Sequence, residues 1–393
     1  MRARLIVFLA AIGGFLPLVT DGFLPAVRPM MAELHTDVPG AQLTISLVLA
    51  GFACAQLIVG TAADRFGRRP VLIVATCLFA FASIGVAASP SLGLVLAFRF
   101  LQGVSAAAGP VLMRAVVRDL CSRAEGARVL SLLGIGFAVV PLVVPAVNAR
   151  VVVTFGWRAA LIIYVLYLAA TLAMAIGWFR ETLAAPDPLA LSPGDLLRVM
   201  GSTLRHPQAL GYMLCCMFGY AGLAVWISSA PHLVSGYFGQ PPERFGIYWA
   251  IPVATYVAGA YVSARALRTC ASETLLKAGV VALMAAGIAL LLLAYRPVAL
   301  NAFVAAVGLY NFGWAIVQPQ AQIGALSFFP RQAGRVSAVL GFLQMLGGAT
   351  IGLLFAYLHD GTPQAAALLI AASALATMVA TVVLTARRPA LST

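Results

Sequence analysis

Two oppositely charged residues stand inside long apolar segments. Asp21 lies within 18–25 and Arg99 within 93–115, among apolar and small residues. If these segments cross a membrane, each charge costs about 2.5–3.5 kcal/mol at the bilayer centre, which marks both residues as functional candidates. Burial favours the uncharged carboxyl, so Asp21 would take up and release protons near neutral pH. An arginine stays protonated, so Arg99 would tune Asp21 and orient nearby carbonyl groups.

Each of the two residues also has an alternative, structural role. Asp21 could act as a cap at the helix break that Pro17, Gly22 and Pro25 favour. Arg99 could extend along its helix to the membrane surface. If instead the two side chains are close, Arg99 would favour the charged form of Asp21 and oppose the effect of burial.

The most specific string in the sequence is GTAADRFGRRP, which begins at Gly60. Gly60 would permit a close helix approach, and Gly67 a tight turn. Asp64 can accept hydrogen bonds from a helix N-terminus, and Arg68 could pair with Asp119 of the next loop on the same side. Such contacts would hold one conformation and release in another. The predicted gate comprises Gly60, Asp64, Arg65, Gly67, Arg68, Arg69 and Asp119.

Polar and aromatic side chains in several apolar segments are candidates for a substrate cavity. Asn311, Trp314 and Gln318 follow i, i+3, i+7 spacing and would share a helix face. Such a mixed face suits a pocket for a partly apolar compound. Alternatively, these groups serve hydrogen bonds and aromatic packing between helices. The cavity candidates are Asp21, Gln102, Asn148, Tyr220, Trp226, Tyr310, Asn311, Trp314 and Gln318.

The elements that must position these residues are membrane-spanning helices. Of the 393 residues, 62% are hydrophobic and 9% are charged, and the mean hydropathy is +0.99. An average soluble domain has about 25% charged residues, and a helical span needs about 20 apolar residues. Uninterrupted apolar runs also exclude an outer-membrane barrel. The predicted spans are 5–27, 41–62, 71–89, 93–115, 128–149, 158–179, 209–231, 244–264, 274–294, 299–321, 336–357 and 363–385.

The basic residues predict the orientation of these spans. With both termini cytoplasmic, nineteen of the 25 Lys and Arg residues fall in cytoplasmic segments and five outside, as the positive-inside rule requires. The longest connection, 181–208, separates a first six-helix bundle, 1–180, from a second, 209–393. Two halves with equal numbers of spans suggest an internal repeat. Within the connection, 195–204 predicts a small helix on the membrane surface.

Other chemistries lack the residues that they need. The net charge of +13 is spread between apolar runs, unlike the basic face of a nucleic-acid-binding protein. The six cysteines form no CxxC pair and the four histidines have no ligand spacing, so we expect neither a disulfide framework nor a metal site. The sequence has no phosphate-binding loop and no nucleophile matched with a histidine. We therefore expect no enzyme and no cofactor, with transport driven by the proton motive force.

Two motifs resemble the major facilitator superfamily. The string that begins at Gly60 resembles the signature G-x-x-x-D-R-x-G-R-R between the second and third helices of that superfamily. Arg99, Gln102 and Gly103 resemble its fourth-helix motif. In the corresponding loop of the second half, Ala264 stands where the first half has Asp64.

Further motifs resemble the bicyclomycin and chloramphenicol resistance subfamily of drug/proton antiporters. Thr20-Asp21, followed by Leu24-Pro25, resembles the first helix of these proteins. Asn148-Ala149 differs, because the fifth-helix signature has a glycine pair at this place. Other residues that resemble the subfamily, around the fifth and sixth spans, are Pro141, Pro145 and the trio Gly156-Trp157-Arg158.

The resemblance implies an all-α membrane protein of twelve helices, in two bundles that rock about a central cavity. It also implies that Asp21 holds the proton and a cationic substrate, that Arg99 takes part in coupling, and that Asp64 and Arg68 belong to a cytoplasmic gate. We therefore expect a monomer in the inner membrane that exports small amphipathic drugs and takes up one proton per cycle. Its expected partners are the lipid bilayer, the substrate and protons, and no nucleic acid.

Two alternatives to drug export remain open at this point. The first is a proton-coupled transporter of a native metabolite, such as a sugar, a nucleoside or a siderophore. The second is a membrane receptor that binds its ligand without moving it. Flux measurements would separate the receptor from both transporters, and the substrate profile would separate the two transporters.

Overall fold

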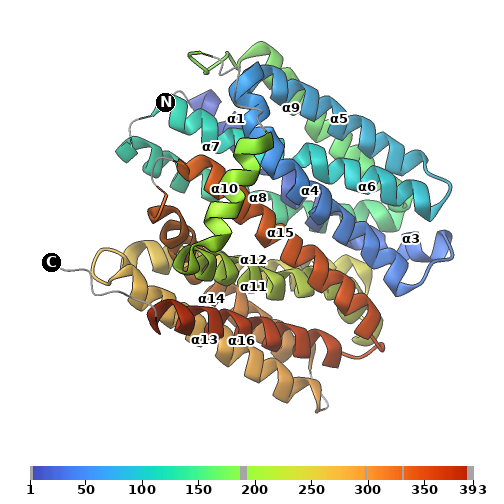
Figure 1. The fold of residues 1–393 in the computed structure, drawn as a ribbon. Coiled ribbons are helices and arrows are strands. Elements are labelled where there is room, and N and C mark those ends of the chain that lie inside the picture. Colours follow the sequence, from blue (N-terminus) through green and yellow to red (C-terminus); the bar gives the residue numbers. More distant parts are fainter. Residues whose placement is uncertain (1–2, 122, 186–192, 297–298, 330–331, 387–393) are drawn as a thin grey trace. The chain divides into compact units, whose positions relative to one another are not determined.

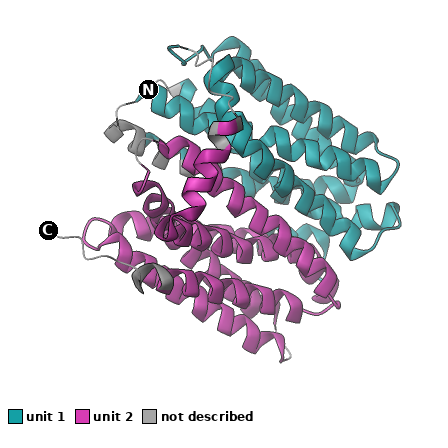
Figure 2. Cartoon of the chain, viewed as in Figure 1, with its two compact units in different colours: residues 1–192, 240–247 teal, residues 193–239, 248–393 magenta. Residues whose placement is uncertain are grey.

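The computed structural model is all-helical over the part of the chain that it describes. It describes residues 3–121, 123–185, 193–296, 299–329 and 332–386, and within these ranges it contains no strand. The contacts divide the chain into two compact units, 1–192 with 240–247 and 193–239 with 248–393 (Figure 2).

Unit 1 begins with a broken span and continues with longer helices (Figure 1). Within this unit α4 packs on α6, α5 packs on α6 and α9, and α8 packs on α1 and on the 3₁₀ segment η1. The elements are α1 (Ala3–Gly13), α2 (Phe15–Thr20), η1 (Asp21–Ala26), α3 (Val27–Glu33), α4 (Val38–Phe66), α5 (Arg68–Ala88), α6 (Leu92–Ala106), α7 (Ala108–Leu120), α8 (Arg123–Phe155), η2 (Trp157–Ala159) and α9 (Ala160–Gly177).

Unit 2 begins with a short helix inside the predicted connection. There α11 packs on α14, α15 and α16, and α13 packs on α14 and α16. Its elements are α10 (Pro193–Arg205), α11 (Pro207–Ala230), the π-helical turn η3 (Pro231–Tyr237), α12 (Phe245–Ala266), α13 (Ser272–Ala294), α14 (Leu300–Ser327), α15 (Ala333–Leu358) and α16 (Gln364–Ala386). Preceding α12, the 3₁₀ turn η4 (Pro242–Arg244) belongs to unit 1.

The all-α membrane fold predicted from the sequence is confirmed, and every predicted span falls on one helix or on consecutive helices. Ten described spans are long and apolar enough to cross a membrane. The bent pair Arg4–Gly13 and Phe15–Glu33, with an angle of 44° between its parts, makes an eleventh. The remaining predicted span falls on α8, which contributes the shorter apolar stretch Val139–Phe155.

The helix surfaces show why this sequence needs a membrane. Large apolar side chains such as Val74, Leu166 and Val281 are between 64% and 68% exposed on spanning helices. Exposed aliphatic surface of this extent is stable in lipid and not in water. The interior, in contrast, uses small residues for close approach, because a Cβ at Gly103 of α6 would collide with the Val48 carbonyl group of α4.

Candidate functional site

The first span changes its helix type where the sequence predicted a functional carboxylate. After Thr20 the backbone changes from α-helix to the 3₁₀ segment η1, which begins at Asp21 and contains Pro25. Proline lacks an N–H and disfavours helical geometry at the preceding residue, which explains the interruption. The break therefore positions Asp21 at a change of backbone geometry inside a span.

Asp21 is buried and makes a local hydrogen bond. Its side chain is 8% exposed, and Thr20 Oγ1 lies 2.8 Å from Asp21 Oδ1 and 2.9 Å from the Leu16 carbonyl oxygen. No described cation lies within ion-pair distance of the Asp21 carboxyl group. The carboxyl group can therefore change its charge without breaking an ion pair.

Arg99 anchors neighbouring helices through their backbones. The side chain is fully buried, which excludes the alternative in which it extends to the membrane surface. It donates to the carbonyl oxygens of Thr44 at 3.1 Å and Val19 at 3.0 Å, and to Gln102 Oε1 at 2.9 Å. Its guanidinium carbon also lies 4.2 Å from the centre of the Phe23 ring. Arg99 thus fixes the backbone and the packing on either side of Asp21.

Gln102 and Asn148, two of the predicted cavity residues, also support this region. Gln102 Nε2 donates to Ser83 Oγ at 2.9 Å, so the Gln102 amide holds Arg99 in place from the other side. Asn148 is fully buried on α8 and donates from Nδ2 to the Gly22 carbonyl oxygen at 2.8 Å. The asparagine that stands in place of a glycine thus ties α8 to the broken span.

Tyr164 is part of the same region, and the sequence analysis missed it. It is fully buried on α9, and a Cβ at Gly22 would lie 2.8 Å from its hydroxyl oxygen. Because Gly22 follows Asp21 directly, this hydroxyl lies beside the segment that carries the candidate proton site. The sequence shows two tyrosines at i, i+3 in this span, Tyr164 and Tyr167, but nothing in it distinguishes one from the other.

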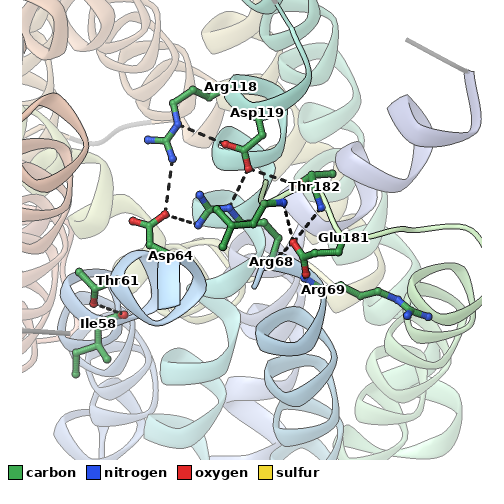
Figure 3. Close-up of polar contacts among 10 residues, drawn as sticks. Ile58, Thr61, Asp64, Arg68, Arg69, Arg118, Asp119, Glu181 and Thr182 are labelled. Atoms are coloured by element: carbon green, nitrogen blue, oxygen red, sulfur yellow. Dashed lines mark hydrogen bonds and ion pairs between the residues drawn. The ribbon is translucent and has the colours of Figure 1, made fainter. Parts of the chain in front are cut away.

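The predicted gate forms a cluster of ion pairs at the junction of α4 and α5 (Figure 3). The structure contains the expected pair of Arg68 and Asp119, with 3.0 Å between Nε and Oδ2. Arg68 Nη1 also lies 2.6 Å from Asp64 Oδ1, and the Arg68 side chain is 2% exposed. One buried guanidinium at the start of α5 thus joins carboxylates at the ends of α4 and α7.

Glu181 completes this cluster and was also missed from the sequence. Figure 3 shows its carboxylate at the N-terminus of α5, where it accepts from the N–H groups of Arg68 at 2.9 Å and Arg69 at 3.0 Å. Desolvation opposes a lower pKa for Glu181, but hydrogen bonds from the N–H groups of Leu183, Arg69, Arg68 and Thr182 lower it overall. The helix N-terminus is thus occupied by Glu181, whereas Asp64 pairs with arginine.

The remaining gate residues play unequal parts. Gly67 has φ of +97° and ψ of 155°, as the predicted tight turn requires. The Arg69 side chain donates to the carbonyl oxygens of Ala175 and Ile176 at the end of α9. Gly60 makes no close approach, since a Cβ there would lie 3.8 Å from Val111 Cγ1.

Arg65 lies apart from these ion pairs. Its guanidinium carbon lies 5.4 Å from the centre of the neighbouring Phe66 ring, and the side chain is exposed. We expect this exposed contact to contribute little to the cluster.

The cavity candidates of α14 have different neighbours. Asn311 Nδ2 donates to the Pro252 carbonyl oxygen at 3.2 Å, and Gln318 accepts from Tyr256 of the same helix, α12. Trp314 instead packs on Gly219 of α11. With about 100° per residue, position i+7 returns to within about 20° of i, whereas i+3 is about 60° away. The three residues lie within about 60° on α14 but contact two different neighbouring helices, α11 and α12.

The aromatic candidates of unit 2 pack mainly on one another and on glycines. Trp226 stacks on Trp249, with 6.3 Å between ring centres and 10° between planes. Tyr310 donates to the Gly219 carbonyl oxygen at 3.1 Å. Tyr220 packs on Gly348, where a Cβ would lie 2.7 Å from the Tyr220 ring. These contacts join α11 to α12, α14 and α15 within unit 2.

A network of uncharged hydrogen-bonding groups lies near the end of α12, where Ala264 corresponds to Asp64 of the first half. Gln320 of α14 donates from Nε2 to Ser263 Oγ of α12 at 3.1 Å. Ser272 at the start of α13 donates to Gln320 Oε1 at 2.6 Å. Three helices of unit 2 are thus joined by an amide and two hydroxyl groups.

Comparisons with known proteins agree with this architecture. The chain is 32% identical to a Chloramphenicol resistance protein of Pseudomonas aeruginosa over 84% of this chain and 78% of that protein. It is 26% identical to a Bicyclomycin resistance protein homolog of Haemophilus influenzae, over 88% and 87% of the two chains. The fold resembles that of the xylose transporter XylE from E. coli, with a TM-score of 0.74, 15% identity and 98% of each chain covered. A family model described as Major Facilitator Superfamily matches residues 5–352, and the chain belongs to this superfamily of transporters.

Proposed function

We propose that this protein exports small amphipathic drugs in exchange for protons by alternating access, with Asp21 as the proton carrier. The observation that carries the proposal is the buried carboxyl group of Asp21, at the start of the 3₁₀ segment of the first span and without an ion-pair partner among the described residues. The relatives named for chloramphenicol and bicyclomycin resistance support the class of substrate.

Thr20 allows Asp21 to be stable in both protonation states. The Thr20 hydroxyl has one hydrogen and two acceptors within reach, Asp21 Oδ1 and the Leu16 carbonyl oxygen. It donates to Asp21 when the carboxyl is ionised. When Asp21 is protonated, the hydroxyl turns to Leu16 and accepts from the acid. Neither state leaves the buried carboxyl without a hydrogen bond, so the proton can bind and leave at low cost.

Arg99 supplies a constant positive charge next to the proton site. Because it is bound to the carbonyl oxygens of Val19 and Thr44, its position does not depend on the charge of Asp21. One proton moving through ~100 mV releases about 2.3 kcal/mol, which supports a concentration gradient of roughly 50-fold. One carboxyl group at this site is therefore sufficient for export at one proton per cycle.

The ion-pair cluster around Arg68 is proposed as the cytoplasmic gate. Its members lie in connections that carry many arginines, which the positive-inside rule assigns to the cytoplasm. Both termini would then face the cytoplasm, and the protein would reside in the inner membrane as a monomer. Alternating access would break the contacts of Arg68 with Asp64 and Asp119, which hold α4, α5 and α7 together here.

The experiment that tests the proposal measures proton release in everted membrane vesicles. The vesicles are energised, a pH-sensitive dye reports the gradient, and chloramphenicol is added to wild type and to Asp21→Asn. We expect wild type to release protons and the variant to be silent at equal protein levels. Asp37→Asn is the matched control, because Asp37 is an exposed cap of α4 and asparagine is an equally good cap.

The other outcomes assign other functions. Proton release in both wild type and Asp21→Asn would remove Asp21 from coupling. Silence of wild type with chloramphenicol, but release with a sugar or a nucleoside, would favour a metabolite transporter. Saturable binding without flux of any compound would favour a receptor.

A further inference from the structure

A short segment of the first span, Val19–Phe23, is held by polar side chains from three other helices. Arg99 of α6 donates to the Val19 carbonyl oxygen and lies over the Phe23 ring. Asn148 of α8 donates to the Gly22 carbonyl oxygen. Tyr164 of α9 places its hydroxyl against Gly22. All three contacts fall within five residues that include Asp21.

Each of these three side chains has a buried polar atom without a hydrogen-bond partner. The atoms are Arg99 Nη2, Asn148 Oδ1 and the Tyr164 hydroxyl oxygen, and all three residues are fully buried. An unsatisfied buried polar group costs about 1–3 kcal/mol. Three such groups around one segment lower the stability of the fold, and a ligand that pairs with them would recover part of this loss.

A comparison within α9 separates the functional tyrosine from a structural one. Tyr164 and Tyr167 both place a hydroxyl 2.8 Å from the position of a Cβ at a glycine of the first span, Gly22 and Gly14 respectively. The Tyr167 hydroxyl donates to the Ala11 carbonyl oxygen at 2.6 Å, whereas the Tyr164 hydroxyl has no partner. On the same helix, the Tyr167 hydroxyl thus stabilises the fold, whereas the Tyr164 hydroxyl is available to bind a ligand.

The three unpaired hydrogen-bonding atoms define the chemistry of the ligand. Arg99 Nη2 is a donor, Asn148 Oδ1 is an acceptor, and the Tyr164 hydroxyl can be either. A hydroxyl or amide group, which both donates and accepts, satisfies this set. A cation is disfavoured, because the site has a net positive charge when Asp21 is protonated and none when it is ionised. A neutral group is accepted in both states.

We propose that Tyr164, Asn148 and Arg99 form a subsite next to Asp21 that binds a neutral hydroxyl or amide group of the transported compound. This inference rests on the proposed function and narrows its substrate class from amphipathic drugs in general to neutral compounds of this kind. It also departs from the cationic substrate that the family resemblance implies for Asp21. Tyr164 is a binding residue here, and Asp21 remains the proton carrier.

The backbone offers a means of access to this buried subsite. Asp21–Ala26 is a 3₁₀ segment within a span, a geometry with weaker hydrogen bonds that often marks a hinge. A change in the geometry of this segment would move Gly22 relative to Tyr164 and Asn148. Binding of the compound and protonation of Asp21 would then act on the same five residues.

The first test uses thermal unfolding of the purified protein in detergent without any compound. We expect Tyr164→Phe to keep or raise the Tm, because the substitution removes an unpaired hydroxyl and keeps the ring. We expect Tyr167→Phe to lower the Tm, because it removes a hydrogen bond to Ala11. An equal fall of Tm in both variants would show that the Tyr164 hydroxyl is structural and would overturn the proposal.

The second test measures binding to the protein in lipid nanodiscs without a proton gradient. The probes are chloramphenicol, which is neutral and has two hydroxyls and an amide, its diacetyl ester, and tetraphenylphosphonium, a cation without hydrogen-bonding groups. We expect Tyr164→Phe to weaken chloramphenicol binding about threefold to tenfold, the effect of one hydrogen bond. The diacetyl ester lacks both hydroxyl groups and keeps the amide, so a loss below twofold assigns a hydroxyl group to the subsite and a loss equal to that of chloramphenicol assigns the amide. Any binding of tetraphenylphosphonium should change less than twofold, and Tyr167→Phe should bind chloramphenicol as wild type does.

The remaining outcomes decide against the subsite. Equal losses for chloramphenicol and tetraphenylphosphonium, which has no hydrogen-bonding group, would indicate altered packing rather than a lost hydrogen bond. Binding of tetraphenylphosphonium without chloramphenicol, or of neither probe, would also overturn the proposal. Failure of antiport is a separate result. If no compound releases protons in the vesicles, but Tyr164→Phe weakens binding as expected, the subsite stands and the proposed proton coupling is wrong.

Discussion

Arg99 donates a hydrogen bond of 3.0 Å to the carbonyl oxygen of Val19 and makes no ion pair with Asp21. The two charged residues of the membrane interior are therefore related through the backbone of the broken span. Arg99 holds the segment in place, and Asp21 is free to change its charge within that segment. The Asp21 carboxyl group can therefore be protonated and become neutral, although the permanent charge of Arg99 is nearby.

The first prediction concerns Arg99→Lys. Lysine keeps the charge but cannot reach the Thr44 and Val19 carbonyl oxygens and Gln102 together, because it lacks the planar fork of arginine. We expect the free energy of unfolding to fall by about 1.5–3 kcal/mol, the value of one hydrogen bond to a charged group. Proton-coupled flux should fall with it. Thermal unfolding and vesicle assays measure both, with the exposed Arg28→Lys as the control.

The second prediction compares two arginines of one loop. Arg68→Ala leaves the Asp119 and Asp64 carboxylates without their buried partner, so we expect a loss of about 1–3 kcal/mol in stability. Arg65→Ala removes only an exposed contact with Phe66 and should change stability by no more than about 0.5 kcal/mol. Equal effects in thermal unfolding would show that the ion-pair cluster is not what holds this junction.

The third prediction concerns the turn between α4 and α5. Gly67 has φ of +97° and ψ of 155°, a backbone region that is essentially restricted to glycine, and a Cβ there would lie 2.6 Å from Glu181 Oε2. Gly67→Ala should therefore destabilise the protein by about 1–3 kcal/mol. Gly93→Ala in α6 is the control, because a Cβ there meets nothing within 4 Å and alanine favours helix. An unchanged Tm for Gly67→Ala would contradict this account.

The fourth prediction is a pH dependence at Glu181. Desolvation acts in the opposite direction, but backbone hydrogen bonds hold the pKa of Glu181 below its ordinary value. The ionised group thus stabilises the fold above the ordinary glutamate pKa, and this stabilisation is lost as pH falls through the lower folded-state pKa. Glu181→Gln should be less stable than wild type at pH 7, and the difference should disappear well below about pH 4. A difference in Tm that stays constant from pH 7 to pH 3 would contradict a role for the charge.

The spans could be predicted from the sequence, whereas several site residues could not. Uninterrupted apolar runs between charged or proline-containing connections predicted every span, because the bilayer imposes a minimum length on each. Asp21 and Arg99 were visible as charges in apolar surroundings. Tyr164 and Glu181 were not, since their roles depend on contacts with Gly22 and Arg68, which are more than 110 residues away in the sequence.

The second-half predictions show the limit of helical spacing as evidence. Spacing alone placed Asn311, Trp314 and Gln318 together, but a helix in a bundle has several neighbours. An angular difference of about 60° is enough to direct Trp314 to α11 and Asn311 to α12. Which neighbour a side chain meets depends on tertiary packing, which periodicity does not contain.

The network of Ser263, Gln320 and Ser272 gives the two halves different sensitivities to the solution. Dissolved ions weaken attraction between exposed charges such as Arg118 and Asp64 of the same cluster, which lie 3.9 Å apart, but hardly affect hydrogen bonds among hydroxyl and amide groups. Raising the ionic strength therefore loosens the junction of unit 1 and leaves that of unit 2 nearly as it was. Electrolyte concentration is therefore an experimental variable that weakens the helix junction of unit 1 selectively, without any change to the sequence.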